Sequence, residues 1–229
     1  MTTPTPEEAR TQIVNMVRDF VRRDVEPVAD RLDREDIVPH DLIDKMKGLG
    51  LFGITVTEEY GGLGLDYTTF ASIFEELSKG FMSISGAIGT HHILTYVLTH
   101  YGTEEQKQRF LPDLASGRKR GGLALTEPSG GSDAAALQTT ATERDGTYFL
   151  NGSKMFITNA SVASTIVVFA TEDGSKGYKG ISAFLVQKDS PGLTINPMHG
   201  KLGMRSSTTD EIVFQDTPVS SDNLLGERG

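Results

Sequence analysis

The chain of 229 residues changes its periodicity near residue 121, and this change limits the folds that it can adopt. Before residue 121, apolar residues recur at three- and four-residue spacings, as they do on one face of a helix. After it, short apolar or alternating runs are separated by Asp-Gly and Asn-Gly pairs, which is typical of strands joined by tight turns. The sequence therefore predicts a helical region that is followed by a sheet region.

Helix start and stop signals divide the first region into several helices. Thr5-Pro6-Glu7-Glu8 and Thr103-Glu104-Glu105-Gln106 both place Thr three residues before Glu or Gln, as in a capping box. Between them we expect a short helix over residues 41–46, one from Asp66 to Gly80, and one over residues 82–100. The last of these is almost free of charge, which indicates a helix buried in a core.

The second region predicts mostly antiparallel strands. Residues 138–144, 147–150 and 153–158 form three expected strands, with tight turns at Asp145-Gly146 and Asn151-Gly152. Further β-type runs cover residues 165–171, 180–187 and 211–215. The expected fold is α+β, with an α-helical bundle domain at 1–120 and a mostly antiparallel β domain at 121–229.

Composition excludes several kinds of partner and site. The net charge of -9 argues against binding to nucleic acid or to an anionic membrane surface. No apolar run approaches the roughly 18 residues of a membrane span. The chain has no cysteine, so disulfides and thiolate sites are absent, which fits a cytoplasmic protein. His91 and His92 are adjacent and lack acidic companions at helical spacing, so no metal site is expected.

Residues 124–133 read Ala-Leu-Thr-Glu-Pro-Ser-Gly-Gly-Ser-Asp and are the most informative stretch of the chain. A strand that runs into such a turn presents backbone N–H groups that can hold an anion, with the Ser132 hydroxyl as an additional donor. A plain glycine-rich turn is the alternative for these residues in isolation. Neither a GxGxxG nor a P-loop sequence occurs, so the common dinucleotide and nucleotide motifs are unsupported.

The stretch from Ala124 to Ala136 resembles the signature of the acyl-CoA dehydrogenase family at every specified position. Four further blocks resemble the family in the same order: Glu58-Glu59-Tyr60-Gly61-Gly62-Leu63-Gly64, Tyr101-Gly102-Thr103-Glu104-Glu105-Gln106-Lys107, Asn151-Gly152-Ser153-Lys154-Met155-Phe156-Ile157-Thr158-Asn159, and Lys201-Leu202-Gly203-Met204-Arg205-Ser206-Ser207. The resemblance thus extends along the entire chain, and it implies a flavoprotein that holds FAD and an acyl-CoA thioester.

The resemblance also implies which residues contact FAD. The segment that starts at Leu123 lies along the cofactor in the family, with Leu125 and Thr126 near the flavin pyrimidine and Gly131 and Ser132 near the pyrophosphate. The second segment comprises Phe156, Ile157 and Thr158, where an aromatic residue covers the flavin face and Thr158 donates toward N5. Many family members carry Trp where this chain has Phe156, and Phe keeps the stacking but loses the indole N–H.

Substrate residues are implied in the same way. Ser132 also touches the CoA part of the substrate in the family, and Gly86 and Gly89 lie on the helix that lines the acyl pocket, where close helix packing is the alternative reading. Glu127 and Asp133 are expected to be structural, although a carboxylate in a signature invites a catalytic reading.

The implied reaction removes a Cα proton while hydride passes from Cβ to flavin N5, which gives a trans-2-enoyl-CoA. The family's catalytic Glu lies beyond the position that matches Gly229, so no catalytic base is expected in this chain and the chain alone is expected to be inactive. A homo-oligomer and an electron-accepting flavoprotein partner are implied for the full-length protein. The alternatives are a naturally short, non-catalytic binding or partner subunit and an oxidase-type relative.

Overall fold

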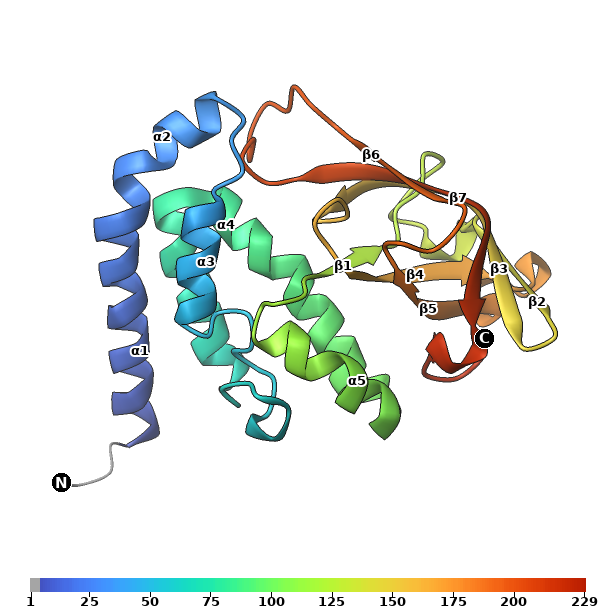
Figure 1. The fold of residues 1–229 in the computed structure, drawn as a ribbon, viewed down its shortest axis with the longest axis horizontal. Coiled ribbons are helices and arrows are strands. Elements are labelled where there is room, and N and C mark those ends of the chain that lie inside the picture. Colours follow the sequence, from blue (N-terminus) through green and yellow to red (C-terminus); the bar gives the residue numbers. More distant parts are fainter. Residues whose placement is uncertain (1–4) are drawn as a thin grey trace.

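The computed structural model describes residues 5–229, in which helices fill the first half and a sheet fills the second. Figure 1 shows α1 along one side of the molecule, the sheet along the other, and α4 and α5 between them. The helices are α1 (Pro6–Phe20), a π-helical turn (Val21–Val25), α2 (Glu26–Arg34), α3 (His40–Gly48), α4 (Tyr67–Tyr101) and α5 (Glu104–Ala115). None of the helices within residues 5–229 has both the length and the apolar character to span a membrane.

Both expected capping boxes are confirmed. The Thr5 hydroxyl accepts a hydrogen bond from the N–H of Glu8, and the Glu8 carboxylate accepts one from the N–H of Thr5. Thr103 and Gln106 make the same reciprocal pair at the start of α5. These bonds satisfy N–H groups that the first turn of a helix leaves without partners.

The two helices expected on either side of Gly80 are joined into one 35-residue helix, α4, with a kink at Phe81. Phe81 has an extended backbone (φ -163°, ψ 102°), which interrupts the helical hydrogen bonds at the predicted position. A side chain on Gly80 would approach Val21 Cγ1 to 2.3 Å, so glycine allows the first half of α4 to lie close against the π-helical turn.

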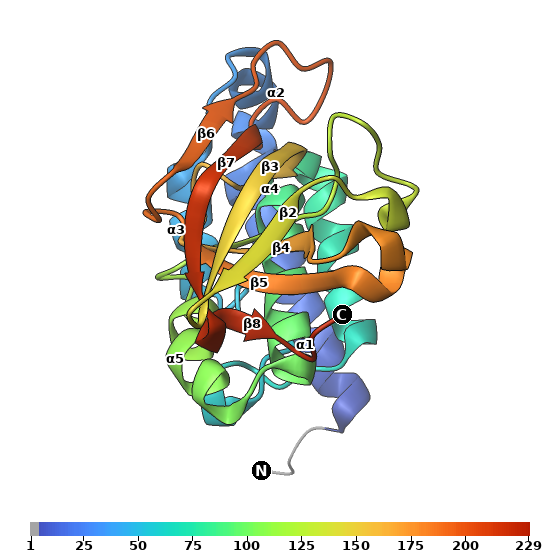
Figure 2. The same ribbon diagram turned by 90° about the vertical axis from the view of Figure 1, so that its right-hand side faces the viewer.

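Eight strands form one mostly antiparallel sheet, which Figure 2 shows in front of the helices. The order is β6-β7-β3-β2-β4-β5-β8, and β1 pairs with β4 in parallel. The strands are β1 (Gly121–Ala124), β2 (Thr140–Arg144), β3 (Thr147–Thr158), β4 (Thr165–Thr171), β5 (Ile181–Gln187), β6 (Leu193–Pro197), β7 (Thr209–Ser220) and β8 (Leu224–Leu225). Short 3-10 helices cover Glu58–Tyr60, Ala134–Ala136, Gly174–Gly180 and Ser221–Asn223.

One of the two expected tight turns is correct and the other is wrong. Asp145 and Gly146 adopt positive φ and connect β2 to β3, as predicted. Asn151-Gly152 forms no turn, because β3 continues through it and pairs with β7 on both sides of a register shift. Gly152 (φ 142°) lies where a side chain would come within 2.8 Å of Thr139 Cα, and Asn151 exchanges hydrogen bonds with Asp216. The register shift beside the pair places one extra residue in β7, where Asp216 has a positive φ of 45°, so β7 bulges opposite Asn151.

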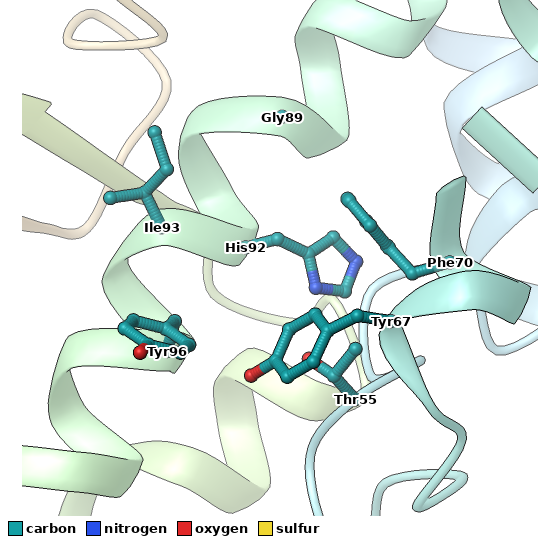
Figure 3. Close-up of a pocket in the computed structure, with 7 residues that line it drawn as sticks. All are labelled: Thr55, Tyr67, Phe70, Gly89, His92, Ile93 and Tyr96. Carbon is teal, nitrogen blue, oxygen red and sulfur yellow. The ribbon is translucent and has the colours of Figure 1, made fainter. Parts of the chain in front are cut away.

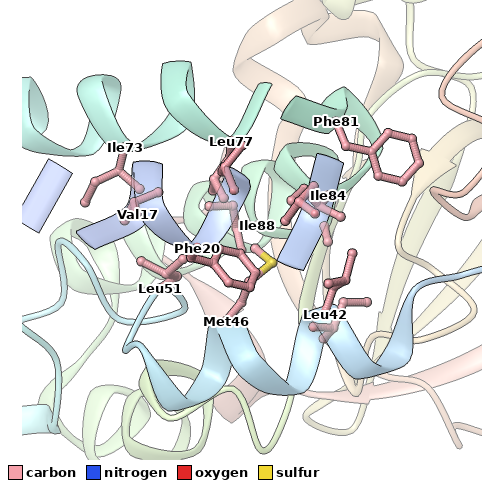
Figure 4. Close-up of a cluster of buried hydrophobic side chains, with 14 of the residues drawn as sticks. Val17, Phe20, Leu42, Met46, Leu51, Ile73, Leu77, Phe81, Ile84 and Ile88 are labelled. Carbon is pink, nitrogen blue, oxygen red and sulfur yellow. The ribbon is translucent and has the colours of Figure 1, made fainter. Parts of the chain in front are cut away.

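Within residues 5–229, the buried apolar side chains form one cluster in each half and a third cluster that joins the halves. The first lies among the helices and includes Val17, Phe20 and Leu77 (Figure 4). The second lies on the sheet, and the third joins α4 and α5 to the sheet by packing Leu94 and Leu98 in one cluster with Val167 of β4. The third cluster fixes the helices relative to the end of β1, where the signature begins.

Candidate functional site

The two segments that the sequence assigns to the cofactor lie side by side. Residues 125–127 follow β1, and residues 154–156 belong to β3. The N–H of Met155 donates to the carbonyl of Thr126 at 2.8 Å, and the Lys154 ammonium donates to the carbonyl of Leu125 at 3.1 Å. We call these two segments, residues 125–127 and 154–156, the paired edge. Residues thirty positions apart in the chain thus form one local surface.

Glu127 is buried beneath this edge. Its carboxylate accepts hydrogen bonds from the N–H groups of Gln138 (2.7 Å) and Thr139 (2.9 Å) and from the Lys154 ammonium (2.8 Å). Burial acts to raise the pKa of Glu127, but these donors outweigh it and hold the pKa below its usual range. Because its carboxylate accepts three hydrogen bonds from the protein, Glu127 is suited to a structural role, fixing residues 138 and 139 against β3.

Lys154 received no role from the sequence, yet it is fully buried and pairs with Glu127. Burial lowers the pKa of Lys154, and the nearby carboxylate opposes that shift. A signal was present in the sequence: Tyr148 and Leu150 on the same strand are buried at alternate positions, and Lys154 falls on the same buried set. A lysine at an inward position of a strand requires a buried partner.

The glycine-rich turn after Glu127 is tightly closed. Glu127 and Gly130 exchange two backbone hydrogen bonds, at 2.9 and 3.1 Å. A side chain on Gly131 would lie 3.0 Å from Thr126 Cγ2, so the turn packs directly on the paired edge. Within residues 5–229, the N–H groups of Gly131, Ser132 and Asp133 donate to no acceptor of the protein. Three successive free N–H groups with an exposed Ser132 make a surface that can bind an anion.

Phe156 is the most unusual residue of the site. It has a positive φ of 61° and is 61% exposed, although it belongs to β3, two residues before the strand ends at Thr158. The pairing of β3 with β7 skips Met155 and Phe156, which frees this part of the strand to contact Thr126. A positive φ strains a bulky residue, and such strain is concentrated at functional sites, so Phe156 is a candidate for a ligand contact. Ile157 is buried and Thr158 pairs with Thr209.

Asn159 and Arg120 connect the site to α4. Asn159, which also has a positive φ (68°), donates to Thr90 Oγ1 at 2.7 Å and to the carbonyls of Gly86 and Ala87. Arg120 donates to Asn159 Oδ1 at 2.7 Å, and burial lowers the pKa of Arg120 to about 10. The sequence analysis assigned no role to either residue, because their partners lie on a helix that is distant in the sequence.

The two glycines assigned to the acyl pocket lie in different surroundings. A side chain on Gly86 would come within 2.9 Å of Met204 Cε, so the chain packs closely against this glycine. Gly89 lines a cavity of about 200 Å³ together with Thr55, Tyr67, Phe70, His92, Ile93 and Tyr96. Figure 3 shows the aromatic side chains and Ile93 around this space. The cavity is apolar in character, and Tyr67 is half exposed at 53%.

His91 and His92 bind backbone groups. The N–H of Gly121 donates to His91 Nδ1 at 3.0 Å, so the proton of the neutral ring lies on Nε2 and is donated to the Phe52 carbonyl. Burial lowers the pKa of His91 to about 3 and that of His92 to about 4. Both rings are therefore neutral near pH 7. Among the residues that the structure describes, no group of three His, Cys, Asp or Glu side chains could hold a metal ion.

Leu123 and Leu125 complete the set of predicted cofactor residues. Leu123 is half-buried within β1 and belongs to the cluster that joins sheet and helices. Leu125 presents its carbonyl to Lys154. The structure thus brings Thr126 into contact with Met155 and with Gly131, and Leu125 into contact with Lys154, while Leu123 lies within β1.

Comparison with known proteins identifies the same family in both halves. Residues 7–118 match the family described as "Acyl-CoA dehydrogenase, N-terminal domain", and residues 122–217 match "Acyl-CoA dehydrogenase, middle domain". The acyl-CoA dehydrogenase of Bacillus subtilis (strain 168) is 43% identical over 220 residues, which make up 93% of this chain and 57% of the relative.

Solved structures agree with this match. The butyryl-CoA dehydrogenase of Megasphaera elsdenii has a TM-score of 0.93 and 37% identity, over 100% of this chain and 61% of that chain. A chain in a structure concerning the electron-transferring flavoprotein of Acidaminococcus fermentans also has a TM-score of 0.93, with 41% identity, over 100% and 60% of the two chains. This chain spans a little over half the length of the relatives described here, and it belongs to the acyl-CoA dehydrogenase family.

Proposed function

We propose that this chain forms the FAD- and acyl-CoA-binding part of an enzyme that dehydrogenates acyl-CoA thioesters between Cα and Cβ. The observation that carries the proposal is the paired edge, where the N–H of Met155 and the carbonyl of Thr126 meet at 2.8 Å. That contact joins Thr126, in the first segment that the resemblance assigns to FAD, to Met155, which directly precedes Phe156 of the second segment. We also propose that residues 1–120 and 121–229 act as two domains that meet beside this edge.

The residues at the site fit FAD. The free N–H groups of Gly131, Ser132 and Asp133 suit a pyrophosphate, because successive backbone donors stabilise negative charge. The exposed ring of Phe156 offers an aromatic face that can stack on a flavin. Thr126 and Thr158 supply hydroxyl groups that can donate to carbonyl oxygens or ring nitrogens. No buried unpaired charge lies at the paired edge, since Lys154 and Glu127 neutralise each other.

The roles of this chain in the reaction are binding and orientation. When bound, FAD supplies the acceptor for a hydride from the substrate. Phe156, Ile157 and Thr158 would hold the flavin ring at the paired edge, and Ser132 would contact both the pyrophosphate and CoA. Gly89 would leave room in the apolar cavity for the acyl chain. We propose, as the resemblance implies, that none of residues 1–229 acts as the catalytic base.

The complete protein's partners are proposals as well. We propose a homo-oligomer that passes its electrons to an electron-transferring flavoprotein, and the similarity to a chain in a structure that concerns such a flavoprotein supports this partner. Several relatives are described as short-chain specific, which makes butyryl-CoA the first substrate to test.

The proposal is tested with the protein expressed from its complete coding sequence. We expect a yellow protein whose flavin absorbance near 450 nm bleaches on anaerobic addition of an acyl-CoA. Butyryl-, octanoyl- and palmitoyl-CoA, added separately, would rank the chain lengths, and peroxide formation in air would identify an oxidase. A folded protein that binds no FAD on titration would contradict the proposal.

A further inference from the structure

The buried pair of Lys154 and Glu127 is a feature that the proposed function leaves unexplained. The Lys154 side chain is 0% exposed and the Glu127 side chain 4% exposed, with their charged atoms 2.8 Å apart. Removing two charges from water costs so much that an apolar pair of the same size is often as stable or more stable. Stability alone therefore gives a weak reason for an ion pair at this position.

The second hydrogen bond of Lys154 suggests another reason. Its ammonium donates to the carbonyl of Leu125 at 3.1 Å, in the segment assigned to the cofactor. The peptide between Leu125 and Thr126 is trans and planar, so its N–H points in the direction opposite to its carbonyl, away from Lys154. Within residues 5–229, that N–H donates to no acceptor, whereas the carbonyl of Thr126 is bound to Met155.

A cation that binds the carbonyl of a peptide group makes the N–H of the same peptide group a stronger hydrogen-bond donor. Hydrogen bonds in series polarise one another, and the effect is largest when one donor is charged and the surroundings exclude water. Lys154 meets both conditions, because it is fully buried and its ammonium is paired with the Glu127 carboxylate. The free N–H of Thr126 is therefore a stronger donor than an ordinary backbone amide.

We propose that Lys154 is a positioning residue for the flavin: through the Leu125 carbonyl it orients and polarises the Thr126 N–H, which donates to an acceptor atom of the flavin ring. Glu127 is the counter-ion that lets the ammonium remain charged in a buried place. The inference rests on the proposed FAD site, and it adds the group that sets the strength of one donor in that site.

If Lys154 had only a structural role, its substitution would affect FAD binding only through the stability of the fold. Four variants of the complete protein separate the two roles: K154M, K154R, E127Q and the double variant E127Q/K154M. R18M is the matched control, since Arg18 forms a 3.0 Å ion pair with the largely buried Glu76 in the helical region. For each protein the Tm, the FAD dissociation constant and the flavin midpoint potential are measured.

We expect K154M to weaken FAD binding by about 5- to 10-fold and to make the midpoint potential more negative, because the reduced ring is richer in electrons and loses more from a weaker donor. K154R keeps the positive charge but is larger than the buried site, so it should lower Tm and shift the potential less than K154M. E127Q removes the counter-ion, so burial should favour the neutral amine of Lys154, and this variant should lower Tm and shift the potential in the same direction as K154M but by less. The double variant should regain Tm relative to K154M and keep the shifted potential. R18M should lower Tm alone.

Two results would overturn the inference while leaving the proposed function intact. One is a K154M protein with the wild-type potential and FAD affinity. The other is a potential that follows Tm across all variants, with R18M shifted as far as K154M. A wild-type protein that binds no FAD would instead overturn the proposed function, and this inference with it.

Discussion

The helical region and the paired edge bury their side chains in opposite ways. Among the helices, the buried cluster consists of apolar residues such as Phe20, Leu77 and Ile88 (Figure 4). Beneath the paired edge, the buried side chains include Lys154 and Glu127, and the neighbouring Phe156 is strained and exposed. Both regions belong to one chain and lie within one fold.

This difference indicates that the helical region contributes mainly to the stability of the fold and the paired edge mainly to ligand binding. Apolar burial contributes roughly 25 cal/mol per Å² to folding and needs no further partner. Buried charges, a positive φ on Phe156 and free N–H groups all cost stability, and they persist where the surrounding structure supports them. Substitutions among the helices should therefore change the free energy of unfolding, while substitutions at the paired edge should change the affinity for a ligand.

Acid should give the largest effect, and it should act on the helical region through His91 and His92. Their pKa values of about 3 and about 4 in the folded state lie below the unfolded value of about 6.5. The unfolded chain therefore binds more protons, and the stability that is present above pH 6.5 is lost as the pH falls toward 4. At pH 5 we expect a loss of about 2 kcal/mol per histidine, or about 4 kcal/mol together.

Urea unfolding at pH 7 and pH 5 measures this loss. The exposed His40 supplies the control, because His40→Gln should leave the difference between the two pH values unchanged. His92→Gln should reduce that difference by about half. An equal loss of stability in wild type and His92→Gln would show that other groups carry the acid sensitivity.

Leu77→Ala should give the next largest effect. Leu77 is 0% exposed in the helical cluster, and such truncations cost about 3 kcal/mol because they leave a cavity. The free energy of unfolding should fall by this amount, while the FAD affinity of the folded protein stays within about 2-fold of wild type. A large loss of FAD affinity at a temperature where the variant is fully folded would break the comparison between the two regions.

Ser132→Ala should show the reverse pattern. Ser132 is exposed, so the free energy of unfolding should change by less than about 0.5 kcal/mol. A hydrogen bond to a charged group contributes roughly 1.5–3 kcal/mol, and its loss should weaken FAD binding by about 10- to 100-fold. Fluorescence titration measures the affinity, with Ser129→Ala in the neighbouring turn as the control. Wild-type affinity in Ser132→Ala would mean that the pyrophosphate lies elsewhere.

Phe156→Gly should give the smallest effect, but with opposite signs in the two measurements. Glycine relieves the positive φ, so the protein without ligand should gain up to about 1 kcal/mol of stability. FAD should bind about 3- to 10-fold more weakly, because the stacking ring is gone. Phe156→Leu keeps the strain and removes only the ring, so it should lower the affinity without the gain in stability. A Phe156→Gly protein that is less stable than wild type would refute the strain argument.

Much of the fold could be predicted because its signals are local. The capping boxes at Thr5 and Thr103 and the turn at Asp145-Gly146 each depend on a few neighbouring residues, and the structure contains all three. The prediction of a turn at Asn151-Gly152 is wrong because the same pair can also lie within a strand, here opposite a bulge of β7. The choice depended on Thr139 and Asp216, which lie close to it only in the folded chain.

The candidate site divides in the same way. The segments around Thr126 and Phe156 could be found because a family signature marks them. Lys154 could be seen in the sequence, but its partner Glu127 lies 27 positions away on another segment. Asn159 forms hydrogen bonds to α4 and to Arg120, and no spacing along the chain predicts such contacts. Contacts between distant segments are set by the fold as a whole.

The parallel pairing of β1 with β4 has a consequence for the order of events during protein synthesis. β1 can complete its ladder only after Thr165–Thr171 has been made, and β3 needs Thr209–Ser220 on its other side. At 5–20 residues per second, a ribosome takes roughly 5–20 s to add the hundred or so residues between α5 and the end of β7. During that interval the helices can be finished while the signature segment still lacks its support. We therefore expect FAD to be taken up after the nascent chain has passed β7.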